Sequence, residues 1–498
     1  MRRVAQPWLP LLLAPFLASC VFLLDYDELQ KGDPSSSVGG AVGEGGAPGS
    51  SAGAGAAGTA GNGFASCGDC DDQDACTIDT CDETGDTPEC LHEPTVGLKL
   101  DGVDVSLPAE HHARVSVVAS GKLFYFATLL ANEATPQIAL YRLASDGTEL
   151  EPLGAETKLE GTPVSNVGLA VEELALGEVV LHGFLAAKPK LGDLPAKVFH
   201  LVNQGDKTIT NLVGTSYLEG NDTLFPQALN IAGSIVGAWI QADHTMAVHD
   251  VGSARTDIFG AASVPATTLS LLSTADDKPA VFFTAQASPG NAVGTYVETA
   301  GQNRARLAEC ETRAGDYLSS SVISTQIPGV WLTNVTRYGA DYLTTGGGAV
   351  ACSKGTCTPL PEDCSKATPS NGLRNVSGAT LHFPTDDPGI VYSVAAIPQV
   401  TTRDDDSSIA EGRLSLALGR VDFSTPGKAQ STGIGGDPDT GLLRIAHNDT
   451  SEASSFAGPD WPAVGILPTE QVAVAWIQPS AGGEGTDLHV QRYKMCLP

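Results

Sequence analysis

The sequence contains little positive charge and few aromatic side chains. Of its 498 residues, 28 are Lys or Arg and 58 are Asp or Glu, which gives a formal net charge of −30, and aromatic residues make up only 6%. A surface of this charge repels nucleic acid phosphates and anionic lipid headgroups. Nucleic acid is therefore excluded as a partner, and the acidity indicates a well-solvated exterior.

The sequence also lacks the common catalytic motifs. It has no GxSxG elbow, no HExxH, no Walker loop and no GxGxxG placed between a strand and a helix. His111 and His112 follow Glu110 in a polar segment and are predicted to lie in a solvated loop. His244 and His249 are five positions apart, but no third metal ligand is evident. We therefore assign no catalytic residue.

Amphipathic patterns of helical period are missing, apart from a weak one near residues 171–176. Strand pairs recur instead: a largely apolar strand is followed by an alternating one and a polar or glycine turn. The pairs are 122–130 with 138–147, 178–186 with 197–206, 234–242 with 245–254, 279–287 with 294–302, 339–346 with 348–355, 389–396 with 413–422, and 471–479 with 487–496.

Seven such pairs over roughly 400 residues favour an all-β fold, a β-propeller of seven blades, with six as the alternative. Two pairs share the core Ala-Trp-Ile-Gln, at 238–241 and 475–478, an interval that fits four blades. An apolar strand buried on both faces suits the middle of a blade. We therefore expect Trp239 and Trp476 to pack between blades. A pair of β-sandwiches or a β-helix remains the competing fold.

The N-terminus has the layout of an export signal. Arg2 and Arg3 precede an apolar run, and Leu17-Ala18-Ser19-Cys20 follows. This tetrapeptide resembles the lipobox of bacterial lipoproteins. The resemblance implies cleavage before Cys20 and acylation of that residue, with chains such as palmitate that give a firm membrane anchor. Val21 after the cysteine implies the outer membrane, on its periplasmic or cell-surface side. An uncleaved membrane-spanning anchor is the alternative.

We divide the chain into four parts. Residues 1–19 are the signal peptide, and 20–63 hold the acylated cysteine and a Gly-, Ala- and Ser-rich segment that cannot bury apolar surface and should be disordered. Residues 64–94 form a small cysteine-rich module that disulfides must hold together, because so short a segment cannot build a core. Residues 95–498 form the propeller.

The cysteine-rich module spans five cysteines between residues 67 and 90. The run from Cys70 through Cys76-Thr-Ile-Asp-Thr-Cys81 to Cys90 resembles the CTDC-type repeat of slime-mould matrix proteins and exported proteins of social bacteria. The four cysteines of this repeat permit three pairings among themselves, and the sequence does not choose among them. Outside the inner membrane the thiols should be oxidised, since ten cysteines remain beyond Cys20.

The other cysteines suggest three further bridges. A two-residue turn at residues 354–355 would place Cys352 opposite Cys357 across a hairpin, at a separation that a disulfide can span. Cys310 with Cys364 and Cys67 with Cys496 are then the remaining pairs.

Calcium is the one cofactor that the sequence suggests. Five carboxylates lie close together in the module, and oxygen ligands at alternating positions suit Ca²⁺. They are Asp69, Asp71, Asp72, Asp74 and Asp79. A solvated acidic loop is the alternative.

Two functions remain open. One is a membrane-tethered, non-catalytic binding or scaffold protein that recognises protein or polysaccharide. The other is a propeller enzyme, a glycan hydrolase or lyase with its site in the central channel. Two carboxylates about 5–9.5 Å apart in that channel would favour the hydrolase.

The Cys352–Cys357 bridge gives a direct test of the strand assignment. Peptide mapping of the unreduced protein should recover the two cysteines in one linked fragment. Recovery of Cys352 linked to any other cysteine contradicts the predicted hairpin.

Overall fold

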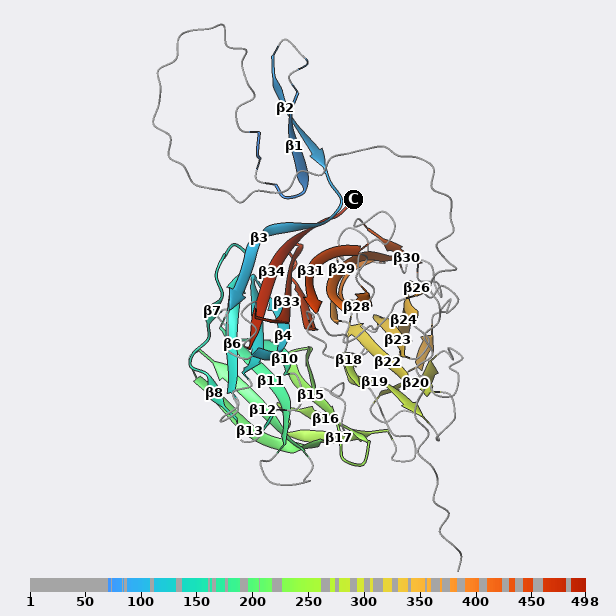
Figure 1. The fold of residues 1–498 in the computed structure, drawn as a ribbon. Helices are drawn as coiled ribbons and strands as arrows, with labels where there is room; N and C mark the ends of the chain where they lie inside the picture. The colour runs from blue at the N-terminus through green and yellow to red at the C-terminus, as the bar shows by residue number, and fades with distance from the viewer. Residues whose placement is uncertain are drawn as a thin grey trace, which may run out of the picture. The chain divides into compact units, whose positions relative to one another are not determined.

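The computed structural model describes most of residues 70–498, apart from segments between strands. For several strands, including all those between residues 305 and 369, it describes only the backbone. The described chain is built from β-strands and turns (Figure 1). Within it, no helix of the length and apolarity needed to cross a membrane is found. The signal peptide, Cys20 and the segment to residue 63 lie outside the described residues.

Seven sheets of four or five strands follow one another along the described chain. The first sheet has β4 (His112–Ser120), β5 (Leu123–Leu130), β6 (Gln137–Ala144) and β7 (Glu151–Pro152), with β8 (Thr157–Lys158) beside β6. The second has β10 (Gly168–Glu173), β11 (Val179–Lys188), β12 (Ala196–Gln204) and β13 (Lys207–Ser216), with β9 (Thr162–Pro163) beside β11. The third has β14 (Gln227–Ile231), β15 (Ser234–Ile240), β16 (Met246–Asp250) and β17 (Arg255–Phe259).

The next three sheets repeat this order. The fourth sheet has β18 (Ser270–Ser273), β19 (Pro279–Gln286), β20 (Val293–Thr299) and β21 (Ala305–Leu307). The fifth has β22 (Tyr317–Ser324), β23 (Val330–Tyr338), β24 (Tyr342–Ser353) and β25 (Thr356–Pro359), with β26 (Thr368–Pro369) beside β24. The sixth has β27 (Ser377–His382), β28 (Ile390–Thr402), β29 (Ala410–Asp422) and β30 (Gln430–Gly433), with β31 (Leu442–Thr450) beside β29.

The last sheet combines the two ends of the described chain. Its order is β3 (Gly97–Leu107), β34 (Thr486–Cys496), β33 (Gln471–Pro479) and β32 (Asp460–Ile466). β3 pairs antiparallel with β34 from Gly97 opposite Cys496 to Leu107 opposite Leu488. A strand from the beginning of the chain therefore completes the sheet formed by its end.

The first strands of the sheets form a closed ring. β4 contacts β10, and contacts continue through β14, β18, β22, β27 and β32, which in turn contacts β4. Figure 1 shows the corresponding colour progression from cyan through green and yellow to red. Sheets arranged radially around their first strands define a β-propeller, so the predicted fold class is confirmed, with seven sheets among the described strands.

All but one of the predicted apolar strands occupy the second position of their sheets. β5, β11, β15 and β33 are buried along nearly their whole length, because a neighbouring sheet covers each face. The repeated Ala-Trp-Ile-Gln segments begin in β15 and β33, four sheets apart, as their spacing predicts. The segment with a weak helical pattern, residues 171–176, instead begins inside strand β10, which runs from Gly168 to Glu173.

The two tryptophans of the repeated segments pack between sheets, as predicted. Trp239 is 2% exposed and lies in a cluster with Phe184 and Val198 of the preceding sheet, and its Nε1 donates to the Thr215 carbonyl at 3.1 Å. Trp476 is equally buried, against residues of β28 and β29. Neither side chain is a ligand platform.

Arg492 forms an ion pair within the closing sheet and links that sheet to the first one through hydrogen bonds. Arg492 of β34 is 5% exposed, and its Nε donates to Asp101 Oδ2 at 3.0 Å. Its Nη1 donates to the carbonyls of Ala144 and Gly147, at the turn after β6. Gln471 Nε2 donates to the same Asp101 oxygen and to the Ser145 carbonyl. The buried guanidinium thus has both a counter-charge and carbonyl partners.

One predicted strand pair is wrong. Residues 339–346 and 348–355 do not form two strands: most of both lie in the single strand β24, which pairs with β23. The glycines at 346–348, where the two predicted strands would meet, lie within this one strand. Between the pairs Thr333–Gly348 and Val335–Thr344 the register shifts, so Thr345, Gly346 and Gly347 form a bulge opposite Asn334.

The hairpin predicted from residues 352–357 has the expected backbone register. Cys352 lies opposite Cys357, and Ser353 lies opposite Thr356. The two cysteine side chains are outside the described part of the structure, so the bridge itself stays a prediction.

His112 is not in a solvated loop, contrary to the sequence analysis. It begins β4, is 1% exposed, and its Nδ1 lies 3.1 Å from Thr128 Oγ1 on β5. Burial lowers the pKa of His112 to about 4. The polar residues around His112 predict a loop, but an inner strand can begin within a polar segment, as β4 does here.

Gly237 lies so close to the preceding sheet that a larger side chain there should destabilise the protein. A Cβ at this position of β15 would lie 2.3 Å from Cε1 of Phe184, which is fully buried in the preceding sheet. We expect Gly237→Ala to destabilise the protein by about 1–3 kcal/mol through overpacking, with partial rescue by Phe184→Leu. Thermal unfolding measures both effects. Gly252→Ala is the control, since its Cβ would meet only ordinary contacts. A Gly237→Ala midpoint equal to that of the control contradicts the packing.

Candidate functional site

The cysteine-rich module is a hairpin of β1 (Thr77–Asp82) and β2 (Glu89–Pro94). Two disulfides are described, Cys70–Cys90 and Cys76–Cys496. The predicted Cys67–Cys496 bridge is therefore wrong, and so is the expectation that the four cysteines of the repeat pair only among themselves. Cys81 is also disulfide-bonded. Cys67, Cys310 and Cys364 lie outside the described residues, so Cys310–Cys364 stays a prediction.

The backbone explains why Cys76 reaches the end of the chain. The Thr95 amide donates to the Cys76 carbonyl at 2.7 Å, and the Thr95 hydroxyl donates to it at 3.2 Å. Two residues later, Gly97 begins β3 opposite Cys496. Cys76 and Cys496 are thus both positioned beside the start of β3, although 420 positions separate them.

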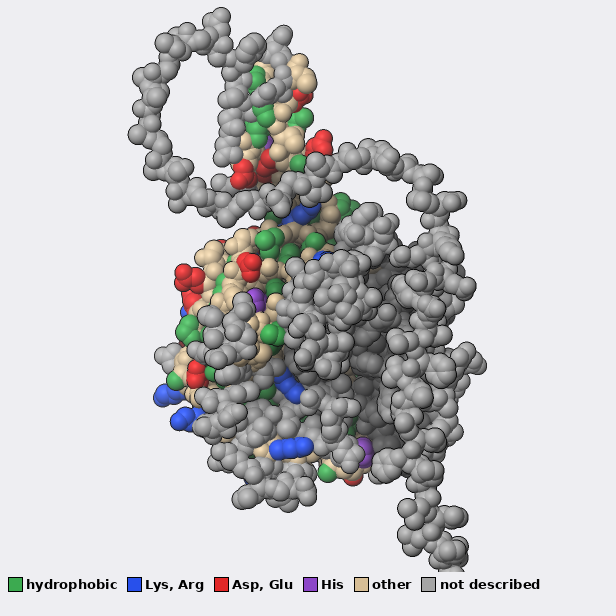
Figure 2. Space-filling view, viewed as in Figure 1, with side chains coloured by type: hydrophobic (Ala, Val, Ile, Leu, Met, Phe, Trp, Pro, Cys, Tyr) green, Lys and Arg blue, Asp and Glu red, His purple; other side chains and the backbone are tan. Residues whose placement is uncertain are grey.

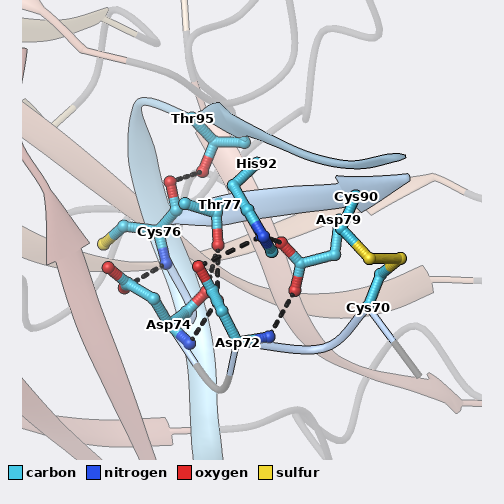
Figure 3. Close-up of polar contacts among 9 residues, drawn as sticks. All are labelled: Cys70, Asp72, Asp74, Cys76, Thr77, Asp79, Cys90, His92 and Thr95. Atoms are coloured by element: carbon cyan, nitrogen blue, oxygen red, sulfur yellow. Dashed lines mark hydrogen bonds and ion pairs between the residues drawn. A yellow bond between two sulfur atoms is a disulfide. The ribbon is translucent and has the colours of Figure 1, made fainter. Parts of the chain in front are cut away.

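The acidic loop before β1 is organised by its own side chains (Figure 3). The amide of Asp74 donates to Asp72 Oδ1 at 2.8 Å, and the amide of Cys76 donates to Asp74 Oδ1 at 2.9 Å. The Thr77 hydroxyl lies 2.9 Å from both Asp72 Oδ1 and the Asp74 carbonyl. These carboxylates therefore fold the turn, as Asp side chains commonly do. In the space-filling view, acidic side chains are visible on this module (Figure 2).

Asp72 and Asp79 meet His92, which sequence reasoning missed. His92 Nδ1 lies 2.7 Å from Asp79 Oδ1 and 3.3 Å from Asp72 Oδ2, while the Asp72 amide donates to Asp79 Oδ2 at 3.0 Å. The hydrogen bond to Asp79 raises the pKa of His92, and the hydrogen bond from His92 lowers the pKa of Asp79. His92 lies in β2, opposite Asp79 in the hairpin register, a pairing that only the strand alignment reveals.

Asp72, Asp79 and His92 are the described residues whose ligand atoms lie close enough to share an ion, within 4.8 Å of one another. Of the five carboxylates predicted for calcium, Asp72 and Asp79 are brought together, whereas Asp74 accepts from the loop backbone and Asp69 is outside the described residues. An imidazole nitrogen is not a ligand that Ca²⁺ favours. Calcium binding here stays a prediction.

A second candidate site lies between the first strands of three consecutive sheets. A pocket of about 450 Å³ is lined by Val118–Ser120 of β4, Leu169–Glu173 of β10, Ala228–Asn230 of β14, and Gly233. Its lining is divided almost evenly between polar and apolar surface, with Ser120, Glu172, Glu173 and Asn230 as the polar side chains. A concave pocket with a few convergent polar groups is a common form of ligand site.

The polar side chains of the pocket are fixed by hydrogen bonds. The Ser120 hydroxyl donates to Glu173 Oε1. Asn230 Nδ2 donates to the Val171 carbonyl at 2.7 Å, and Asn230 Oδ1 accepts from the Gly233 amide at 2.9 Å. Glu172 Oε2 lies 3.0 Å from Nε2 of His182 on β11. The pocket is therefore pre-organised by contacts within and between sheets.

A buried histidine pair continues from Glu172 into the sheet. His182 Nδ1 lies 3.0 Å from His200 Nε2, and the two residues are 4% and 5% exposed. Burial lowers the pKa of His182, against the opposing effect of Glu172. Burial, together with His182 and His249, lowers the pKa of His200 to about 4. Both rings are therefore neutral near neutral pH.

Neutrality fixes the direction of the hydrogen bonds, because a neutral imidazole carries one N–H. The carboxylate of Glu172 can only accept, so Nε2–H of His182 donates to it. Nδ1 of His182 then accepts from Nε2–H of His200. Both ring nitrogens of His182 are thus occupied, one by Glu172 and one by His200. No local sequence pattern marks this chain of contacts.

His244 and His249 are not brought together as a metal pair. His244 lies in the turn before β16, while Nδ1 of His249, near the other end of that strand, lies 2.9 Å from Thr256 Oγ1.

No family model and no curated protein matches the chain. Similar solved structures include the fucose-specific lectin from Aleuria aurantia, which is 11% identical over 67% of this chain and 97% of its own, with a TM-score of 0.34. They also include the polysaccharide lyase Uly1, at 7% identity over 76% and 89% with a TM-score of 0.40. The Trypanosoma rangeli sialidase is 9% identical over 84% and 57%, with a TM-score of 0.35. Similarity at this level carries no argument about activity.

The His92 contacts predict a measurable titration. Since the pKa of His92 is raised, the ion pair with Asp79 should be fully formed below the ordinary histidine value of 6.5 and be lost as the pH rises through the raised value. Histidine resonances followed by NMR should show this midpoint, and Asp79→Asn should move it downward. Asp82→Asn is the control, because Asp82 instead accepts from Thr84. An unchanged midpoint in Asp79→Asn contradicts the assignment.

Proposed function

We propose that the protein is a membrane-tethered, non-catalytic glycan-binding propeller, with its ligand site in the pocket between β4, β10 and β14. The observation that carries the proposal is this pocket of about 450 Å³, whose lining combines apolar surface with oriented polar side chains. Sugar rings present both apolar faces and hydroxyl groups, and pockets for small ligands have volumes of about 300–1,000 Å³.

A glycan fits this site better than a protein partner does. Stable protein–protein interfaces bury about 800 Å² on each partner, whereas a concave pocket of this size receives one or two small rings. The proposal extends to the tether: acylated Cys20 and the segment to residue 63 hold the propeller on the outer membrane, on the periplasmic or cell-surface side.

Binding is favoured over catalysis by the contacts of the two carboxylates. The hydrogen bond between Glu172 and His182 is the feature that speaks for the alternative, a propeller hydrolase or lyase. However, both nitrogens of His182 are occupied within the sheet and its side chain is buried, so the ring cannot reach a substrate in the pocket. Glu173 accepts from Ser120, which leaves both carboxylates in fixed positions as acceptors.

Glycan binding and the position of the binding site in the pocket can be tested together. The detergent-solubilised full chain should bind members of a glycan array, and Ser120→Trp, which fills the pocket, should abolish the signal. Thr148→Trp places the same side chain at an exposed position and should bind as the wild type does. Equal thermal unfolding of the two variants checks their folding. Absence of any glycan signal, or undiminished binding by Ser120→Trp, contradicts the proposal.

A further inference from the structure

The side chains of the pocket present hydrogen-bond acceptors rather than donors. The one hydroxyl proton of Ser120 is directed at Glu173. Asn230 directs one amide hydrogen at the Val171 carbonyl and its oxygen at the Gly233 amide, so one amide hydrogen is the remaining side-chain donor. Glu172 and Glu173 each have one carboxylate oxygen engaged, at Oε2 and Oε1 respectively. Their other oxygens are the main polar groups available to a ligand.

The negative charge of these carboxylates has no counter-charge among the described residues of the pocket, whose lining includes no Lys, Arg or His. His182 contacts Glu172 from within the sheet as a neutral ring, so it orients the carboxylate without neutralising it. The chain as a whole carries a formal charge of −30. A ligand that bears carboxylate or sulfate groups would meet both repulsion and a shortage of donors.

An ammonium group has the opposite properties. It carries three donors, no acceptor and one positive charge, and charge-assisted hydrogen bonds to carboxylates are about twice as strong as neutral ones. Glu172 and Glu173 are consecutive residues of β10, and both line the same pocket. Because consecutive side chains of a strand point to opposite faces, each of the two carboxylates offers a charged acceptor to an ammonium group on its own side of β10.

We infer that the pocket selects glycans that carry protonated amino groups and rejects acidic glycans, with Glu172 and Glu173 as the specificity-determining residues. This inference rests on the proposed glycan-binding function and specifies its ligand class. It makes His182 a positioning residue, which acts on the ligand only through Glu172.

Three tetrasaccharides of similar size separate the possible ligand chemistries. Glucosamine, N-acetylglucosamine and galacturonate tetramers are titrated calorimetrically into the detergent-solubilised full chain, at low salt and about pH 6, where amines are protonated and carboxylates ionised. The glucosamine tetramer should bind at least about 10-fold more tightly than its N-acetylated counterpart, and the galacturonate tetramer should not bind. Salt should weaken the first interaction most, because it screens the charges.

Two variants test the assigned residues. Glu172→Gln and Glu173→Gln keep an oxygen that can accept from His182 or Ser120, and each should weaken glucosamine binding about 10-fold while leaving N-acetylglucosamine binding within about 2-fold. Glu149→Gln removes the same charge at an exposed position outside the pocket and should change neither affinity.

The outcomes distinguish this inference from the proposed function. Equal binding of the glucosamine and N-acetylglucosamine tetramers, or loss of selectivity in Glu149→Gln, overturns the selection for amines but leaves glycan binding intact. Preference for the galacturonate tetramer overturns the inference as well. Failure of all three tetramers also overturns it, and the glycan array then decides whether the proposed function survives.

Discussion

Closure of the ring of sheets is the constraint on which the rest of the structure depends. The strands β32 to β34 cannot complete the last sheet alone, and β3 from the other end of the chain supplies the fourth strand. Three kinds of interaction hold this junction: the backbone ladder between β3 and β34, the buried Arg492–Asp101 ion pair, and the Cys76–Cys496 disulfide. Without β3, the edge of β34 would be exposed, and propellers avoid such edges by closing the ring.

The closed ring also determines where a ligand site can form. The pocket exists because β4, β10 and β14 come from three sheets held at fixed angles around a common centre. Three of its polar side chains are oriented across adjacent sheets, by the hydrogen bond from Ser120 to Glu173 and that from Asn230 to the Val171 carbonyl. The cysteine-rich hairpin is covalently joined to the same junction through Cys76, so the hairpin and the closing strand meet at one point.

The architecture could be predicted from the sequence because its signal is local. A strand covered on both faces must be apolar along its length, and β5, β11, β15 and β33 are recognisable for that reason. Trp239 and Trp476 were assigned correctly from the same logic. Where a local signal was ambiguous the prediction failed: a glycine run can be a turn or, as in β24, a bulge, and polar residues around His112 concealed the start of an inner strand.

The candidate sites were harder to predict because their contacts are non-local. The pocket brings together residues from three segments roughly 50 positions apart, and nothing in any one of them marks a site. His182 and His200 meet only through the register of β11 and β12, and His92 meets Asp79 only through that of β1 and β2. The pairing of Cys76 with Cys496 depends on where β3 begins, which the cysteine spacing does not contain.

Stability of paired cysteine variants tests the role of ring closure most directly. Cys76→Ala with Cys496→Ala opens a loop of 420 residues, whereas Cys70→Ala with Cys90→Ala opens one of 20. In the chain-entropy description these bridges differ by roughly 3 kcal/mol. Denaturant unfolding combined with hydrogen exchange should show the larger loss in the first variant, with β3 and β34 exchanging first. Equal stabilities and unchanged protection of β3 and β34 would contradict the account.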